Sequence, residues 1–97
     1  MTGDLLRRAA DEVERLARQA PPGRWTARGL LATRPEIVAD DDGRTEHVAE
    51  ARSRSAPWIL TMSPAVAPAL AAWLREAADD PTPAAVALAT AVLAGAP

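Results

Sequence analysis

Alanine is the feature that most constrains what this chain can fold into. The 97 residues include 24 alanines but only three tryptophans and two methionines, and they lack phenylalanine and tyrosine. Alanine favours helix and allows close packing, yet it contributes little buried area. A chain of this length buries only roughly 60–65% of its unfolded surface. We therefore expect one domain spanning 1–97, with a lean core that self-association or a partner completes.

A helix is predicted over residues 4–19, because one face of that segment is apolar. Its apolar positions recur at alternating spacings of three and four residues: Leu6, Ala9, Val13, Leu16 and Ala20. Thr2 can cap the N-terminus of this helix. Pro21-Pro22-Gly23 ends it, since consecutive prolines neither donate backbone hydrogen bonds nor continue a helix.

Two short strands are predicted next, at Arg24–Arg28 and Glu36–Ala39. In the first, Trp25 and Ala27 alternate with polar residues, which is typical of a strand with one buried face. The second contains Ile37-Val38, and β-branched residues favour extended structure. We expect the two strands to pair as an antiparallel hairpin.

Residues 45–54 are compatible with two structures. A strand at 45–50 would follow the Asp42-Gly43 turn, which is a strong hairpin signal, but its alternation of polar and apolar residues is poor. A helix fits the content of alanine, glutamate and arginine, and it would pair Glu50 with Arg54. We favour the helix and keep the third strand as the alternative.

Two further helices complete the predicted fold. Ser63-Pro64 and Thr82-Pro83 are each typical of a capping residue followed by a proline in the first helical turn. The first of these helices runs to about Ala78 and the second through Leu93. The predicted order is α-β-β-α-α-α, an α+β domain in which helices cover a small sheet.

Composition limits the classes of function. There is no cysteine, and the net charge of −2 argues against a general nucleic-acid binder. All eleven basic residues are arginine, which is typical of a high-GC genome such as that of an actinobacterium or its phage. The N-terminus lacks the layout of a signal peptide, and no apolar run reaches the ~20 residues of a membrane span. We expect a cytoplasmic protein that does not contact a membrane.

Catalytic and metal-binding patterns are weak. His47 is the only histidine, and no motif supplies it with a catalytic partner, although Glu50 or Asp40 could serve. The run Asp40-Asp41-Asp42 lacks the alternating spacing of a calcium loop. We therefore predict no enzymatic activity, no metal and no cofactor.

The candidate binding residues are arginines, tryptophans and the histidine. A basic patch beside an aromatic ring can hold a phosphate or stack on a base. Among the tryptophans, we expect Trp73 in the core, and Trp25 holding its strand against the N-terminal helix. Trp58 follows Pro57 and is the best candidate for exposure, although burial is still the favoured interpretation. The candidate binding set is Arg24, Trp25, Arg28, His47, Arg52 and Trp58.

One segment, Ala20-Pro21-Pro22-Gly23-Arg24-Trp25, resembles a motif of small uncharacterised actinobacterial and actinophage proteins. In those proteins an N-terminal helix runs into Ala-Thr-Pro-Gly-Pro-Trp and short strands follow. A second segment, residues 45–52, is similar to their Ala-Glu-Phe/His-Ile-Ala-x-Ala-Arg segment. The likeness spans most of residues 5–78, with Pro21 and Arg24 departing from the motif. It implies a helix at residues 45–52 and brings no established activity.

These observations lead to two functional hypotheses. The first is a small non-enzymatic accessory or regulatory protein of bacterial or phage origin that binds a protein partner or forms a homodimer. The alternative is a module that binds a small ligand or nucleic acid through its arginine and tryptophan face.

Overall fold

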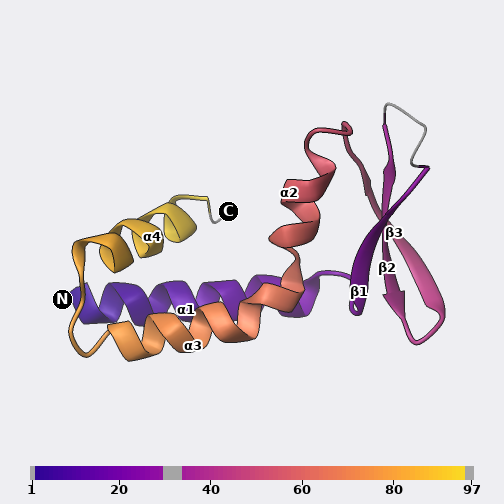
Figure 1. Cartoon of the computed structure of the whole chain (residues 1–97). Coiled ribbons are helices and arrows are strands. Elements are labelled where there is room, and N and C mark those ends of the chain that lie inside the picture. The colour runs from indigo at the N-terminus through magenta and orange to yellow at the C-terminus, as the bar shows by residue number, and fades with distance from the viewer. Residues whose placement is uncertain (1, 30–33, 96–97) are drawn as a thin grey trace. The chain divides into compact units, whose positions relative to one another are not determined.

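The computed structural model describes residues 2–29 and 34–95, and it has the predicted α+β class (Figure 1). The chain divides into a helical unit, residues 1–19 and 67–97, and a sheet unit, residues 20–66. Each unit is described by itself, and the prediction of a single domain stays a prediction. The elements in chain order are α1 (Thr2–Gln19), β1 (Arg24–Arg28), β2 (Glu36–Asp41), β3 (Arg44–Glu50), α2 (Ala56–Thr61), a 3₁₀ turn (Pro64–Val66), α3 (Ala67–Ala77) and α4 (Pro83–Ala94).

In the helical unit, α3 and α4 each pack along α1 and barely touch one another (Figure 1). Leu6 of α1 and Leu74 of α3 are fully buried and are the largest residues of the core. Alanines supply the remaining buried positions: Ala9, Ala10, Ala71, Ala78, Ala85 and Ala89. Because alanine lets backbones approach closely, this core is thin, as the composition predicts. The backbones of α1 and of the residue after α3 approach closely at Gly3, where a Cβ would lie 2.6 Å from the carbonyl oxygen of Ala78.

The predicted apolar face of the first helix is only partly covered. Leu6 and Ala9 are buried, whereas Leu16 remains 39% exposed. The expectation that Trp73 belongs to the core is wrong, since its side chain is 45% exposed. Ala71, Leu74 and Ala78 form the buried face of this segment, and Trp73 precedes Leu74 by about 100° around the helix.

An ion-pair network on the surface joins α1 to α3. The Arg75 guanidinium donates to Asp11 Oδ1 at 2.9 Å and also to Glu14 Oε1. The bond from Arg75 holds the pKa of the Glu14 carboxyl below its ordinary value, and the two carboxylates raise the pKa of Arg75. Because these groups are exposed, the network adds modest stability that salt weakens.

Helix α4 begins as predicted. Thr82 caps it by accepting a hydrogen bond from the Ala85 N–H at 3.2 Å, and Pro83 occupies the first turn. The start predicted at Ser63-Pro64 is a 3₁₀ turn instead, and regular helix begins only at Ala67. Pro68 explains the delay, because in a regular helix that began at Pro64 it would lack the N–H that bonds to the carbonyl of residue 64.

Residues 56–77 are, by length and composition alone, apolar enough to cross a membrane. Core helices of soluble proteins pass the same test, and in this chain a 3₁₀ turn interrupts the segment. The segment is thus weak evidence for a membrane span. The predictions of a cytoplasmic location and of no membrane contact stay predictions.

The sheet unit contains three antiparallel strands in the order β1-β2-β3. The predicted pairing of the first two strands is confirmed, with Thr26 opposite Val38. The turn between β2 and β3 places Asp42 at φ 53° and Gly43 at φ 86°, and the Gly43 N–H donates to Asp40 Oδ1 at 2.9 Å. The Asp-Gly signal is therefore a real hairpin turn.

The helix favoured for 45–54 is wrong, and the alternative third strand is confirmed. β3 runs from Arg44 to Glu50 and pairs along β2. The register shifts where β2 passes from Ile37 to Val38, which is a β-bulge opposite His47–Ala49. An extra residue at this point breaks the alternation on which a strand assignment depends. Pairing with β2 also outweighs the helix propensity of alanine and glutamate.

Helix α2 covers one face of the sheet. Ala56 lies in a cluster with Ile37 and Ala51, and partly buried residues pack around it: Trp25, Ala27, Val48, Ile59 and Leu60. Alternation along the strands sends the intervening residues to the other face, which includes Thr26, Val38 and His47. The sheet therefore has an apolar face under α2 and an opposite face that is polar except at the buried Val38.

Candidate functional site

All six candidate residues from the sequence lie in the sheet unit, but they do not form one site. Arg24, Trp25 and Arg28 are on β1, and His47 is on β3. Arg52 lies in the segment between β3 and α2, and Trp58 is on α2. His47 lies apart on the polar face of the sheet, and the other five lie on three further surfaces: a groove beside β1, the outer face of α2, and a hollow lined by Arg52.

The groove beside β1 has a volume of about 770 Å³. It lies between β1 and the C-terminal end of α2 with the residues that follow it. Its lining residues are Gly23, Arg24, Trp25, Thr26, Ala27, Leu60, Thr61, Ser63 and Ala65. The Trp25 indole N–H donates to the Pro21 carbonyl at 3.0 Å, so its polar atom is satisfied and its ring is held in place. The predicted contact of Trp25 with the first helix would join the two units and stays a prediction.

β1 is an edge strand that pairs only with β2 among the residues that the structure describes. Alternate residues of an antiparallel edge strand direct their N–H and C=O groups away from the sheet. Arg24 and Arg28 stand at its two ends, both exposed, and neither forms an ion pair within residues 2–29 and 34–95. The edge therefore offers unused backbone hydrogen bonds between two positive charges.

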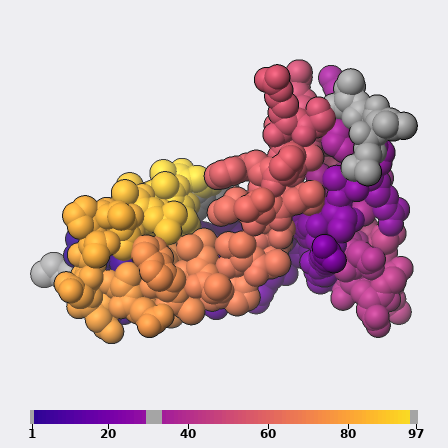
Figure 2. All heavy atoms as spheres, in the orientation of Figure 1, coloured from indigo at the N-terminus to yellow at the C-terminus, as the bar shows by residue number. Residues whose placement is uncertain are grey.

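The outer face of α2 is apolar and exposed. Trp58 is 70% exposed, so the favoured interpretation of burial was wrong. Met62 lies one helical turn further on and is 49% exposed, and Figure 2 shows atoms of this segment at the surface. Ile59 and Leu60 face the sheet instead. A short helix with one apolar face on the sheet necessarily turns its remaining side chains outward.

His47 lies on the polar face of the sheet, where its Nδ1 is 2.7 Å from Glu36 Oε2. The sequence analysis named Glu50 and Asp40 as its possible partners, but the structure gives it Glu36 on β2. Both side chains are substantially exposed. Within the described residues no cluster of three or more histidine, aspartate or glutamate side chains is placed to hold a metal. This pair alone does not provide a nucleophile or define a reaction.

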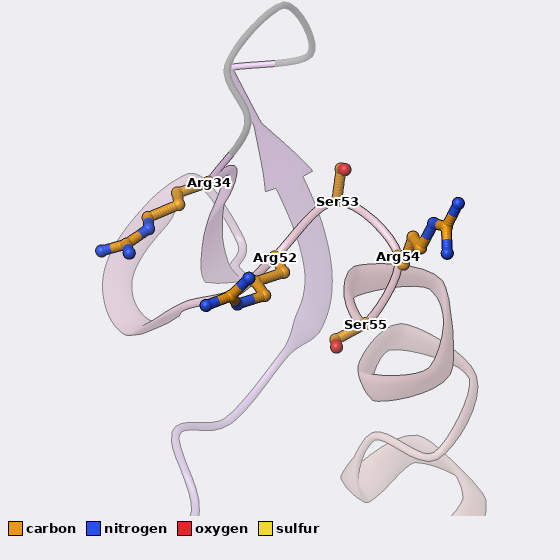
Figure 3. A pocket seen from close by; sticks show the side chains of 5 residues that line it. All are labelled: Arg34, Arg52, Ser53, Arg54 and Ser55. Carbon is orange, nitrogen blue, oxygen red and sulfur yellow. The ribbon is translucent and has the colours of Figure 1, made fainter.

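The third surface is a hollow of about 400 Å³ lined by arginine and serine side chains (Figure 3). Its lining residues are Arg34, Arg52, Ser53, Arg54 and Ser55. Arg34 and Arg52 extend toward one side, whereas Arg54 extends toward the other (Figure 3). Arg52 thus belongs with Arg34 and lies in a different hollow from Trp25.

Arg34, Ser53 and Ser55 are not among the binding residues predicted from the sequence. What identifies them is the pairing of the segments that flank β2 and β3. Beyond the end of the β2–β3 ladder, the Ala51 N–H donates to the Pro35 carbonyl at 3.0 Å. This bond brings residue 34 opposite residue 52. The signal becomes visible only once residues 44–50 are assigned to a strand and its register is known.

The chain matches no family model, no curated protein and no solved structure. The resemblance to small actinobacterial and phage proteins therefore stays a prediction.

Proposed function

We propose that this protein is a small non-enzymatic accessory protein that binds an extended segment of a partner protein along β1. The observation that carries the proposal is the unpaired outer edge of β1 running beside the groove of about 770 Å³. An extended peptide that adds to a sheet edge gains main-chain hydrogen bonds, and pockets beside the edge select its side chains.

The two faces of β1 indicate the chemistry of the partner. Trp25 and Ala27 lie on the face that α2 covers, so side chains of the added strand on that side meet the groove. Arg24 and Arg28 alternate with them and lie on the opposite face. A matching segment therefore alternates apolar side chains, which enter the groove, with acidic side chains, which meet the arginines.

A second copy of this chain is a poorer match for the same edge. Antiparallel pairing of two β1 strands about Thr26 would set Arg24 opposite Arg28 of the other copy, and parallel pairing would set like arginines together. Like charges directly opposite each other destabilise a strand pair. Acidic side chains of a partner strand opposite Arg24 and Arg28 would attract these arginines instead of repelling them. A homodimer through β1 is therefore disfavoured relative to a complex with an acidic segment.

The test begins with a random peptide display library selected against the whole chain. Selected peptides are expected to alternate apolar and acidic residues over about four or five positions, matching the five residues of β1. Synthetic versions then carry N-methyl groups at successive positions. In an added strand, the N–H groups of alternate residues point toward β1 and those of the intervening residues point away. A methyl group on an N–H of the first set should therefore abolish binding, and one on an N–H of the second set should be tolerated.

Matched arginine variants locate the site. Arg24→Gln and Arg28→Gln should each weaken binding of the acidic peptides by roughly two- to tenfold, since exposed charge pairs contribute modestly. Arg44→Gln makes the same charge change on β3, outside the residues that line the groove, and should leave the affinity unchanged. Uniform tolerance of N-methylation, or binding lost in Trp58→Ala alone, would contradict strand addition at β1. Salt-sensitive binding of a single-stranded oligonucleotide that Arg24→Gln or Arg28→Gln weakens would favour the alternative hypothesis.

A further inference from the structure

The chain segments flanking β2 and β3 bring two arginines together outside the regular sheet. Glu36 lies opposite Glu50, and the next bond joins the Ala51 N–H to the Pro35 carbonyl. Continuing the same antiparallel register places Arg34 opposite Arg52. Both side chains extend toward the same side in Figure 3. Directly opposite residues of antiparallel segments have their Cβ atoms about 4.5–5.5 Å apart, so the two side chains leave the backbone next to each other.

This pair of arginines has no ionic partner in the part of the chain that the structure describes. Neither guanidinium forms an ion pair within residues 2–29 and 34–95. Glu36, on the same face, is hydrogen-bonded to His47. Like charges opposite each other destabilise the pairing of their segments. Because both side chains are exposed, this repulsion is modest, and an anion bound between the two guanidinium groups would remove it.

The hollow beside the pair supplies room and hydroxyl groups. Its volume of about 400 Å³ falls at the small end of ligand pockets. Ser55 lines it and immediately precedes α2, yet its side chain makes no capping hydrogen bond. Ser53 lines the same hollow. A serine hydroxyl that caps no helix, such as that of Ser55, can donate to an oxyanion alongside two arginines.

We infer that Arg34 and Arg52, opposite each other beyond the end of the β2–β3 ladder and beside a hollow that Ser53 and Ser55 also line, bind a compact, doubly charged phosphate group. Two planar guanidinium forks match the several oxygens of one phosphate. Glu36 and Glu50 lie further along the same face, so the positive region is short. Together with the net charge of −2, these carboxylates oppose a long polyanion such as a nucleic-acid backbone but leave space for one phosphate monoester.

The test is an NMR titration of the ¹⁵N-labelled full-length protein at low salt with inorganic phosphate and then with glycerol phosphate. We expect saturable shifts at Arg34, Arg52 and Ser55, with a dissociation constant on the order of 1 mM or lower. Inorganic phosphate and glycerol phosphate distinguish a site for the free ion from one that also contacts an attached organic group. Tighter binding of the ester identifies an esterified ligand, and equal or tighter binding of inorganic phosphate identifies the free ion.

Three variants make the test specific. Arg34→Gln and Arg52→Gln should each weaken phosphate binding by about tenfold or more, and they should fold, because each removes one of two repelling charges. Arg44→Gln is the matched control on β3 and should bind as the unmodified chain does. The inference is overturned if all three variants bind phosphate equally, if phosphate gives no saturable shift, or if only a single-stranded oligonucleotide binds at this hollow.

Discussion

Gly23, at the turn into β1, provides the sharpest test of the sheet unit. Its φ of +101° is a conformation that side chains disfavour, and a Cβ there would lie 2.2 Å from the Asp40 carbonyl oxygen and 2.8 Å from the Asp41 nitrogen. Gly43 is the natural control, because it also has a positive φ, +86°, but a Cβ there would meet nothing within 4 Å. The two glycines therefore separate backbone strain from steric conflict.

The magnitudes follow from this difference. Gly43→Ala has only the left-handed backbone to accommodate, and it should lower the free energy of unfolding by about 1–2 kcal/mol. Gly23→Ala has the same strain and must also move the backbone of β2, since Asp40 pairs with Arg24 and cannot rotate away. Overpacking of this kind costs about 1–3 kcal/mol more, so its total loss should be about 2–5 kcal/mol.

Urea denaturation of both variants, followed by circular dichroism, measures the two losses. Amide hydrogen exchange at Val38 and Ala39 of β2 reports on the sheet unit in particular, because both residues are buried in the middle strand. Exchange at these amides should accelerate more in Gly23→Ala than in Gly43→Ala. Equal losses in the two variants would refute the reasoning, since they would mean that the turn before β1 has room for a methyl group.

Three further predictions concern the helical unit. Leu74→Ala should lower the free energy of unfolding by about 2–5 kcal/mol and Leu16→Ala by less than about 1 kcal/mol in urea denaturation, because Leu74 is fully buried and Leu16 is 39% exposed. Stability should fall as pH drops through the pKa of Glu14, which Arg75 holds below its ordinary value. The stability that the Glu14–Arg75 pair contributes is present above the pKa of Glu14 in the unfolded chain and lost below its pKa in the folded chain. Arg75→Gln should therefore lose less stability than the unmodified chain on acidification, and high salt should reduce the difference between the two proteins. Thr82→Ala should cost about 0.5–2 kcal/mol by thermal denaturation, whereas Thr82→Ser should cost little, because serine retains the capping oxygen.

Local signals in the sequence predicted the elements whose structure local chemistry determines. Helix α1 follows from its apolar periodicity and its Pro21-Pro22 stop, and α4 follows from Thr82 as a cap. β3 could not be predicted in the same way, because the bulge shifts the register opposite Ile37 and Val38 and disrupts its alternation. Its structure depends on hydrogen bonds to β2, which are long-range and leave no local pattern.

The candidate site shows the same division. Trp25 was identifiable because an aromatic residue in a five-residue strand stands out, and the groove beside β1 contains it. The pairing of Arg34 with Arg52 was not identifiable, since it depends on register and on the bond from Ala51 to Pro35. His47 was noticed as a lone histidine, but its partner, Glu36, lies on another strand.

The tryptophans connect the alanine-rich composition to the proposed function. Leucine, isoleucine, valine and alanine fill the buried hydrophobic positions among the described residues, while Trp58 and Trp73 are 70% and 45% exposed. Trp25 is the one tryptophan that packs against a described core cluster, and it also lines the groove beside β1. A chain with so few bulky residues would bury its largest side chains first if folding alone determined their positions. Tryptophan is among the residues that contribute most to binding energy, so these exposed side chains agree with the proposal that the chain binds a partner.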